Sequence, residues 1–287
     1  MEVRTDALTG AVVAVAASRQ ARPNQPVDDC PFCVGGIEAP EPYDVKAFTN
    51  RWPSFPDDRC EVVLYAPDHD ATFWSIGVDG AAKVVDLWAE RSRALGGRDD
   101  IAYVLVFENR GAAVGATIPH PHGQIYAYDL VPPTPSAELA RVDALGTCPL
   151  CAEDPGERLV SESGGWRAWV PLASMYPYGL VVAPLAHEPD LPSLSPASRR
   201  ELATVLVDVL HRLDALWDSP MPYMLWVHQR PFDGAAWPAA HVHVEIAVPL
   251  RAPGVQRYVA AGELGSGLFV NPVVPETAAR SLREVSW

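Results

Sequence analysis

Two stretches of the chain carry apolar residues at the three- and four-residue spacing of an amphipathic helix. The first stretch ends at Gly96-Gly97, and its pattern is carried by Val84, Leu87, Trp88, Arg91 and Leu95. The second begins after Ser195-Pro196, a typical helix start, and its pattern is carried by Leu202, Val205, Leu206, Val209 and Leu213. Each predicted helix is followed by an apolar run typical of a strand, at residues 103–107 and 223–227. The pattern therefore predicts one helix–strand succession that occurs twice.

The duplication extends to cysteine and histidine residues. Two Cys-Pro-x-Cys sequences, at residues 30–33 and 148–151, lie 118 residues apart. In both cases a His follows the second cysteine after 36 residues, and a His-x-His sequence follows later, at 120–122 and 241–243. We therefore predict an α+β protein of two tandem units, residues 1–137 and 138–287, with antiparallel sheets and flanking helices. The Pro-rich residues 131–135 are the predicted connector between them.

Charge and composition limit the class of ligand. The 287 residues include 22 Lys and Arg against 36 Asp and Glu, a formal net charge of −14. This charge disfavours a broad contact with nucleic acid or with an anionic membrane, so an anionic ligand must be bound locally. Apolar runs such as residues 102–107 are far shorter than the roughly 20 residues of a membrane span. Residues 1–6 lack the features of a signal peptide. We expect a cytoplasmic protein that binds neither a nucleic-acid polymer nor a membrane.

Each predicted unit contains the ligand set of a structural zinc site. Two cysteines at i and i+3 together with two distant histidines suit the tetrahedral coordination that zinc prefers. The predicted ligands are Cys30, Cys33, His69 and His120 in the first site, and Cys148, Cys151, His187 and His241 in the second. The alternative is a redox-active cysteine pair with unrelated histidines, and the repetition of the whole pattern argues against it.

The most specific stretch of the chain is residues 115–124, Gly-Ala-Thr-Ile-Pro-His-Pro-His-Gly-Gln. Its His-Pro-His-Gly-Gln run resembles the motif of galactose-1-phosphate uridylyltransferases, in the transferase branch of the histidine-triad superfamily. The resemblance continues in Arg19-x-x-Arg22-Pro23, Asn50-Arg51-Trp52-Pro53, Pro67-Asp68-His69 and the run 107–115. Members of this family consist of two histidine-triad-like halves, which agrees with the duplication, and the resemblance makes residues 1–137 the catalytic half.

The resemblance implies a nucleotidyltransferase with a covalent intermediate. His122 would attack the α-phosphorus of a UDP-hexose, release the sugar 1-phosphate and carry the UMP group until a second hexose 1-phosphate accepts it. A neutral imidazole is a good nucleophile near pH 7. Gln124 stands where histidine-triad hydrolases have a third His, and it would hydrogen-bond the phosphoryl oxygens. Because an amide cannot protonate a leaving group, Gln124 favours transfer over hydrolysis.

The resemblance also implies which residues bind the nucleoside-diphosphate sugar and the sugar 1-phosphate. The matching positions lie around the diphosphate, around the base and ribose, and at a phosphate reached in part across the interface of a homodimer. In this order they are Asn109, Gly115 and Thr117, then Asn50 and Trp52, then Arg19 and Arg22. Arg257 stands in place of a Lys in the family's C-terminal segment, which contacts the sugar and its phosphate.

The second half leaves alternatives for its metal. Members of the family without a second cysteine pair are described as using a Glu and three His, and candidates for that set are Glu138, His228, His241 and His243. We favour the Cys/Cys/His/His site, with zinc or iron as the metal, in resemblance to two-zinc members such as ADP-glucose phosphorylase-like proteins. His243 aligns with the nucleophile, but Val242 and Glu245 replace Pro and Gln, which predicts a non-catalytic copy.

Two other functions stay open. One is an ADP-sugar or dinucleotide phosphorylase, in which inorganic phosphate accepts the nucleotidyl group. The other is a zinc-stabilised nucleotide-binding protein without turnover. The intact His122-Gly123-Gln124 sequence argues against the second, because a protein that only binds has no need of a nucleophile.

Overall fold

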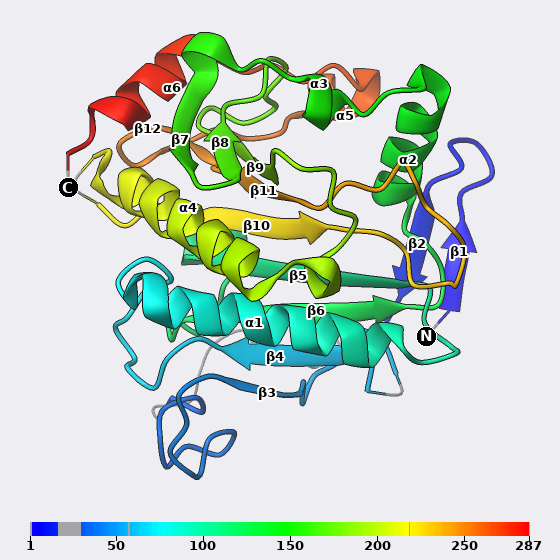
Figure 1. The fold of residues 1–287 in the computed structure, drawn as a ribbon, viewed down its shortest axis with the longest axis vertical. Coiled ribbons are helices and arrows are strands. Elements are labelled where there is room, and N and C mark those ends of the chain that lie inside the picture. Colours follow the sequence, from blue (N-terminus) through cyan, green and yellow to red (C-terminus); the bar gives the residue numbers. More distant parts are fainter. Residues whose placement is uncertain (1, 17–29, 57, 218, 287) are drawn as a thin grey trace.

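The computed structural model describes residues 2–16, 30–56, 58–217 and 219–286 (Figure 1). Its main feature is a nine-stranded sheet in which every neighbouring pair is antiparallel. In spatial order the strands are β3 (Lys46–Thr49), β4 (Cys60–Leu64), β6 (His122–Tyr128), β5 (Tyr103–Arg110), β10 (Tyr223–His228), β11 (His243–Ala247), β9 (Leu180–Pro184), β8 (Trp166–Trp169) and β7 (Leu159–Ser163). Two small hairpins, β1–β2 (Glu2–Thr5, Val12–Val15) and β12–β13 (Leu250–Ala252, Val255–Gln256), are separate from it.

Two long helices cover one face of this sheet. They are α1 (Gly77–Gly96) and α4 (Pro196–Ala215), which lie side by side in Figure 1. The Ser195 hydroxyl caps α4 by accepting from the Ser198 N–H at 3.1 Å. The other helices are α2 (Pro133–Leu145), α3 (Pro149–Ala152), α5 (Ala261–Ser266) and α6 (Pro275–Glu284). Both predicted helices and the antiparallel α+β class are thus confirmed.

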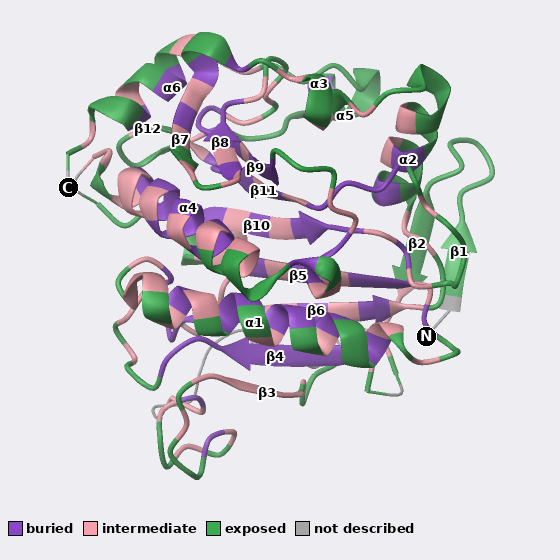
Figure 2. Ribbon diagram, viewed as in Figure 1, coloured by how far each residue is buried: buried purple, intermediate pink, exposed green. Residues whose placement is uncertain are grey.

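The hydrophobic core lies between α1 and α4 and the face of the sheet that they cover. The buried apolar residues of both helices belong to one core cluster with those of the strands, and Figure 2 shows buried segments along both helices. Trp88 of α1 is fully buried there, and burial of such a side chain stabilises the fold by roughly 1.5–3 kcal/mol. Residues alternate along β6, so that Ile125 and Ala127 are buried in this core while His122 and Gln124 lie on the opposite face. Polar side chains are therefore placed on the face opposite α1 and α4.

The sheet is built from two equivalent halves that meet at the β5–β10 pair. The order β4–β6–β5 in the first half is repeated as β9–β11–β10 in the second. In the first half Gln124 pairs with Phe107, and in the second Glu245 pairs with Trp226. The predicted division between residues 137 and 138 falls inside α2, since the prolines of the expected connector begin that helix. The division itself stays a prediction.

In both His-x-His sequences the first histidine lies outside the strand that contains the second. β6 begins at His122 and β11 at His243, so His120 and His241 precede their strands. Pro121 has no N–H to donate to a neighbouring strand. The Val242 N–H donates to the Glu188 carbonyl at 2.7 Å, outside the sheet.

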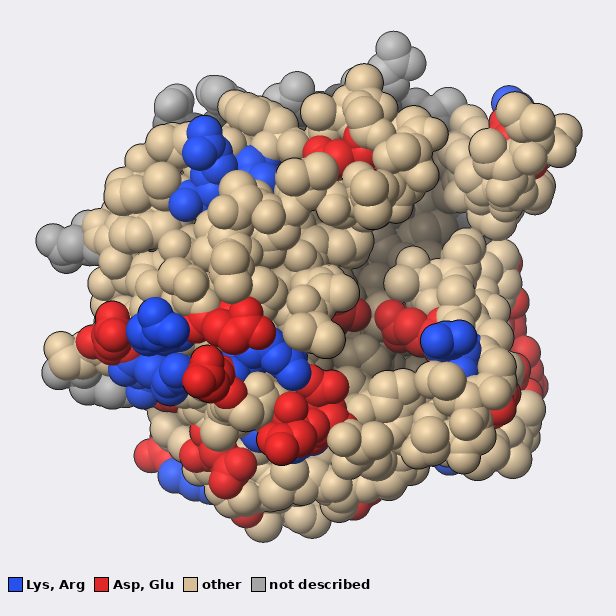
Figure 3. Space-filling view, turned by 90° about the horizontal axis from the view of Figure 1, so that it is seen from above, with Lys and Arg blue, Asp and Glu red and all other residues tan. Residues whose placement is uncertain are grey.

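None of the helices in the described ranges has the length and apolar character to cross a membrane. On the face shown in Figure 3, much of the Lys and Arg surface is interleaved with Asp and Glu.

Candidate active site and metal-binding groups

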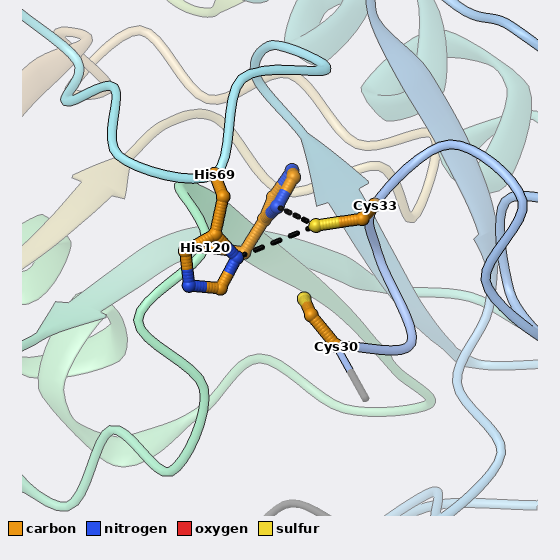
Figure 4. Close-up of side chains that lie close together, drawn as sticks. All are labelled: Cys30, Cys33, His69 and His120. Atoms are coloured by element: carbon orange, nitrogen blue, oxygen red, sulfur yellow. Dashed lines mark hydrogen bonds between the residues drawn. The ribbon is translucent and has the colours of Figure 1, made fainter. Parts of the chain in front are cut away.

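The first cysteine pair and two histidines form a compact group at one end of the sheet (Figure 4). Its four ligand atoms, from Cys30, Cys33, His69 and His120, all lie within 4.8 Å of one another. Cys33 Sγ lies 3.4 Å from His69 Nδ1 and 3.7 Å from His120 Nδ1. Zinc bonds of about 2.0–2.3 Å in a tetrahedron separate ligand atoms by about 3.3–3.8 Å. The residues therefore fit a tetrahedral metal ion.

The other ring nitrogen of His120 is also fixed. His120 Nε2 lies 2.8 Å from the Ala66 carbonyl oxygen and 2.8 Å from the Tyr43 hydroxyl. Since a carbonyl only accepts, Nε2 carries the proton and Nδ1 presents its lone pair to the cysteines. Burial lowers the pKa of His120, which keeps the ring neutral. Sequence reasoning missed Tyr43, which no spacing rule connects to the motif.

The second half contains a corresponding group. Cys148 Sγ lies 3.3 Å from His241 Nδ1, and Cys151 Sγ lies 3.3 Å from His187 Nδ1 and 3.4 Å from His241 Nδ1. Burial raises the pKa of Cys151 to about 11 and lowers that of His241 to about 4. A bound cation would stabilise the thiolates, and neutral imidazoles are the form that binds it. Both groups could hold a metal ion.

A pocket of about 260 Å³ lies in the first half, on the face of the sheet opposite α1 and α4. Five of the predicted site residues line it together with three others, Phe107, Ala116 and Tyr126. The five are Asn109, Gly115, Thr117, His122 and Gln124. The strands β5 and β6 and the loop between them thus bring the predicted chemistry to one place.

The imidazole of His122 has a defined orientation in this pocket. Its Nδ1 lies 2.7 Å from the carbonyl oxygen of His120. Because that carbonyl can only accept, Nδ1 is the protonated nitrogen and Nε2 carries the lone pair of the neutral ring. The backbone carbonyl of His120, whose side chain belongs to the first Cys/His group, therefore sets the tautomer of His122, the candidate nucleophile.

Two neighbouring side chains arrange the amide of Gln124. The Asn50 Nδ2 group donates to Gln124 Oε1 at 3.4 Å, which fixes the carbonyl end of the Gln124 amide. The Asn50 Oδ1 atom accepts from the Trp52 N–H at 2.8 Å, and the Trp52 side chain is 44% exposed. Asn50 therefore adjoins the pocket, and Trp52 lies at the surface next to it.

The loop before the histidine motif depends on Gly115. Its φ of +82° lies in the left-handed region that side chains disfavour, while a Cβ atom there would meet nothing within 4 Å. The glycine is therefore needed for the backbone conformation of this loop.

A larger pocket, of about 560 Å³, lies on the same face in the second half. It contains a third group of ligand-type side chains within 4.8 Å of one another, Glu138, His228, His243 and Glu245. His228 Nδ1 lies 2.8 Å from Glu138 Oε2. Although burial opposes it, Glu245 and Glu138 raise the pKa of His243. This group contains Glu245 and lacks His241, which lies with the cysteines. The two groups in the second half therefore share no residue, although both border this pocket.

Comparison with known proteins decides the family. The model described as "Galactose-1-phosphate uridyl transferase, N-terminal domain" matches residues 53–132, and that of the C-terminal domain matches residues 151–286. The galactose-1-phosphate uridylyltransferase of Thermotoga maritima is 38% identical over 312 residues, covering 99% of this chain and 98% of the relative. The chain belongs to the galactose-1-phosphate uridylyltransferase family.

Solved structures of the galactose-1-phosphate uridylyltransferase family agree with the fold. A uridylyltransferase structure superposes with a TM-score of 0.88 at 30% identity, covering 99% of this chain and 97% of that one. The ADP-glucose phosphorylase from Arabidopsis thaliana, with bound ADP-glucose, gives a TM-score of 0.82 at 25% identity over 99% and 98% of the two chains. The family fold therefore occurs in proteins named for two different reactions.

One predicted substrate residue of this family member, Arg257, does not line the pocket. Arg257 is 6% exposed and forms an ion pair with the buried Glu263, between the rings of Tyr176 and Phe269. Glu263 and the Val270 carbonyl oxygen bind its Nη2 group, while its Nε and Nη1 atoms have no partner among the described residues, so the phosphate contact that the family pattern implied stays a prediction. Arg19 and Arg22 lie outside the described residues.

Proposed function

We propose that the protein transfers a UMP group between UDP-hexose and hexose 1-phosphate, with His122 as the nucleophile. The observation that carries this proposal is the orientation of the His122 ring by the His120 carbonyl, in a pocket that also contains Gln124. Full-length similarity to a galactose-1-phosphate uridylyltransferase supports the choice of nucleotide and sugar.

The reaction takes place in two displacements. In the first, the Nε2 lone pair of His122 attacks the α-phosphorus, a nitrogen–phosphorus bond forms, and the bond to the bridging oxygen breaks. The electron pair leaves with the sugar 1-phosphate, and the ring keeps its Nδ1 proton on the His120 carbonyl. In the second, a phosphate oxygen of the other hexose 1-phosphate attacks the same phosphorus, and the electron pair returns to Nε2. Covalent catalysis of this kind divides one difficult displacement into two easier ones.

The other pocket residues bind the phosphoryl group. With Asn50 at its carbonyl oxygen, Gln124 has its NH2 group available as a donor to a non-bridging oxygen. The Thr117 hydroxyl and the Asn109 amide add donors on the same pocket wall, and the Gly115 loop adds backbone. Asn50 bonds the pocket residue Gln124 and the Trp52 N–H, so both residues lie next to the pocket and are suited to the base and ribose.

We assign zinc to the group of Cys30, Cys33, His69 and His120, and zinc or iron to Cys148, Cys151, His187 and His241. The soft thiolate and imidazole donors and their tetrahedral separations support this assignment. Four protein ligands close the coordination sphere, which is typical of a structural ion. The ion would fix the loops on either side of the pocket and the position of His120.

A phosphorylase is the second candidate function. The similarity to an ADP-glucose phosphorylase extends over 99% of this chain, at 26% identity. In that reaction inorganic phosphate replaces hexose 1-phosphate as the acceptor, and the same His122 adduct would serve both.

An acceptor panel separates the two functions. The purified protein is incubated with UDP-glucose or ADP-glucose, together with galactose 1-phosphate or inorganic phosphate, and the nucleotide products are quantified. A transferase converts UDP-glucose to UDP-galactose. Formation of ADP from ADP-glucose and phosphate, with no UDP-galactose, would contradict the uridylyltransferase assignment and establish the phosphorylase.

We also propose a cytoplasmic homodimer. All five cysteines are free thiols, which are typical of a reducing compartment. Residues 3–14 of the β1–β2 hairpin are exposed throughout, including Val3, Leu8 and Val13. An isolated two-stranded ribbon is only marginally stable in water, so a subunit contact would stabilise it. Light scattering of the pure protein measures the mass, and a monomer at micromolar concentration would contradict the dimer.

A further inference from the structure

A buried carboxylate lies directly behind the catalytic strands, on the face covered by the helices. Glu108 of β5 is 4% exposed, and its Oε1 accepts a hydrogen bond from the Tyr223 hydroxyl at 2.8 Å. The Tyr65 hydroxyl lies against Gly123, which the β5–β6 register places opposite Glu108, and neither this hydroxyl nor Glu108 Oε2 has a hydrogen-bond partner among the described residues. Burial raises the pKa of Glu108 to about 7. Burial of a carboxyl group and two hydroxyls makes the fold less stable than apolar side chains in the same place would.

Tyr65 holds the chain on both sides of His122. Its backbone N–H donates to the Pro121 carbonyl at 3.1 Å. Its ring lies against Gly123, where a Cβ atom would overlap the Tyr65 hydroxyl and come within 3.1 Å of the Phe107 carbonyl oxygen. Glycine is therefore required at 123 by the position of the Tyr65 ring. The neighbour of Glu108 is thus the residue that contacts the backbone around the nucleophile.

A small cavity joins Glu108 to the same segment from another side. Its volume of about 30 Å³ is space for one or two water molecules. Glu108, Asn109, His120 and His122 all border it. The buried carboxylate and the candidate nucleophile therefore lie around one cavity, although they belong to different faces of their strands.

The second half supplies an internal comparison. Strand register makes Glu108, Gly123 and Tyr65 equivalent to Val227, Val244 and Pro184. These three residues are buried and apolar. The same architecture is thus built with apolar residues at these three positions in the half that lacks the His-Pro-His-Gly-Gln sequence. The fold of this unit does not require Glu108 and Tyr65. Because their burial lowers the stability of the protein, we infer that they serve the chemistry of the first half.

We propose that Glu108 is a positioning residue that acts through Tyr65 to fix the backbone of Pro121–Gly123 and thereby the aim of His122. This rests on the proposed role of His122 as the nucleophile. Glu108 touches neither substrate nor the reacting atoms. Its contribution is to the geometry of attack, in which a misplacement of about 1 Å costs up to about a hundredfold in rate. It should therefore affect the rate of adduct formation and leave nucleotide binding unchanged.

The test replaces the polar group by an apolar one of similar volume. The variant Tyr65→Phe/Glu108→Met/Tyr223→Phe keeps both rings and removes the carboxylate and both hydroxyls. We expect its melting temperature to equal or exceed that of the wild type, while single-turnover uridylylation by UDP-glucose slows at least tenfold. The Kd for UDP-glucose, measured by calorimetry in a His122→Ala background, should stay within twofold. A role confined to folding would instead lower the melting temperature and the rate together.

Three companion variants complete the design. Glu108→Gln retains the acceptor for Tyr223 and should keep at least a third of the wild-type rate. Tyr65→Phe alone should slow adduct formation several-fold at unchanged Kd, and it decides the question if the triple variant does not fold. Val244→Ala opens a cavity at the equivalent of Gly123, and it should lower the melting temperature while the rate stays within twofold.

The outcomes are distinct. Unchanged adduct formation in the triple variant or in Tyr65→Phe would overturn the positioning role alone, and so would a rate that falls only in proportion to stability. Absence of any adduct on His122 in the wild type would overturn the proposed function as well.

Discussion

His122 Nδ1 lies 2.7 Å from the backbone carbonyl oxygen of His120. Because the His120 side chain belongs to the first Cys/His group, one residue connects a metal-binding group to the orientation of the nucleophile. The second half repeats this contact at 2.8 Å, between His243 Nδ1 and the His241 carbonyl. What differs there is the surrounding chemistry, with two carboxylates beside His243. Phosphate would be repelled from that pocket, whereas amide and hydroxyl groups surround His122.

Replacing Cys30 by Ser should remove one metal ion and inactivate the enzyme. Loss of a ligand to a structural zinc ion costs roughly 4 kcal/mol or more of unfolding free energy, and here it also releases His120. Metal content by inductively coupled plasma mass spectrometry and a transfer assay check both effects. Cys60→Ser is the control, because Cys60 lies outside both metal-binding groups. A Cys30→Ser enzyme with full metal content would contradict the assignment.

Replacing Cys148 by Ser should separate stability from catalysis. The second group lies away from the first pocket, so we expect loss of one metal ion and a lower melting temperature. The rate of the protein that remains folded should stay within about threefold of the wild-type rate. Assay below the melting temperature of the variant measures this. If transfer is abolished in folded protein, the second half has a catalytic role.

The side chain of Gln124 should stabilise both steps of transfer. Replacement by Ala removes a hydrogen bond to a charged oxygen, worth ~1.5–3 kcal/mol, and should slow formation and breakdown of the adduct by about ten- to a hundredfold. Gln124→Glu keeps the shape of the side chain and replaces the amide donor by an anion, so it should slow the adduct steps at least as much as Gln124→Ala does. Parallel lines in double-reciprocal plots of the wild type would agree with the two-step scheme, and intersecting lines would contradict it.

Glu108 should give the protein a pH-dependent stability. Its folded pKa of about 7 lies above its ordinary value of 4.5, so the native state keeps a proton that the unfolded chain releases. Its contribution is therefore complete below pH 4.5 and is lost as the pH rises to 7, by about 3 kcal/mol. Glu108→Gln should remove this loss. Urea unfolding of both proteins at pH 5 and pH 8 checks it, and an equal pH dependence in the two would contradict the burial of an ionisable Glu108.

Much of the fold and the metal groups follows from the sequence because the signals are local and occur twice. The apolar pattern around Trp88 predicts α1, and the spacing from Cys33 to His69 recurs from Cys151 to His187. A periodic face or a repeated ligand set is informative without knowledge of the third dimension.

Other features could not be predicted, since they depend on which strands become neighbours. Glu108 in an apolar strand resembles an outward-facing residue until β10 brings Tyr223 against it. The resemblance placed Glu138, His228 and His243 in one candidate set, but that Glu245 completes the group, and His241 does not, depends on how β11 lies beside β10. The burial of Arg257 beside Glu263, six residues later, likewise depends on how the C-terminal segment folds.

The central claim is that His122 carries the nucleotide, and intact-protein mass spectrometry after incubation with UDP-glucose tests it most directly. The wild type should gain one uridylyl group per chain, lost again on addition of galactose 1-phosphate, and peptide mapping should place it on residue 122. His122→Ala should gain none, and His243→Ala should gain it as the wild type does. An adduct on His243, or none in the wild type, would contradict the account.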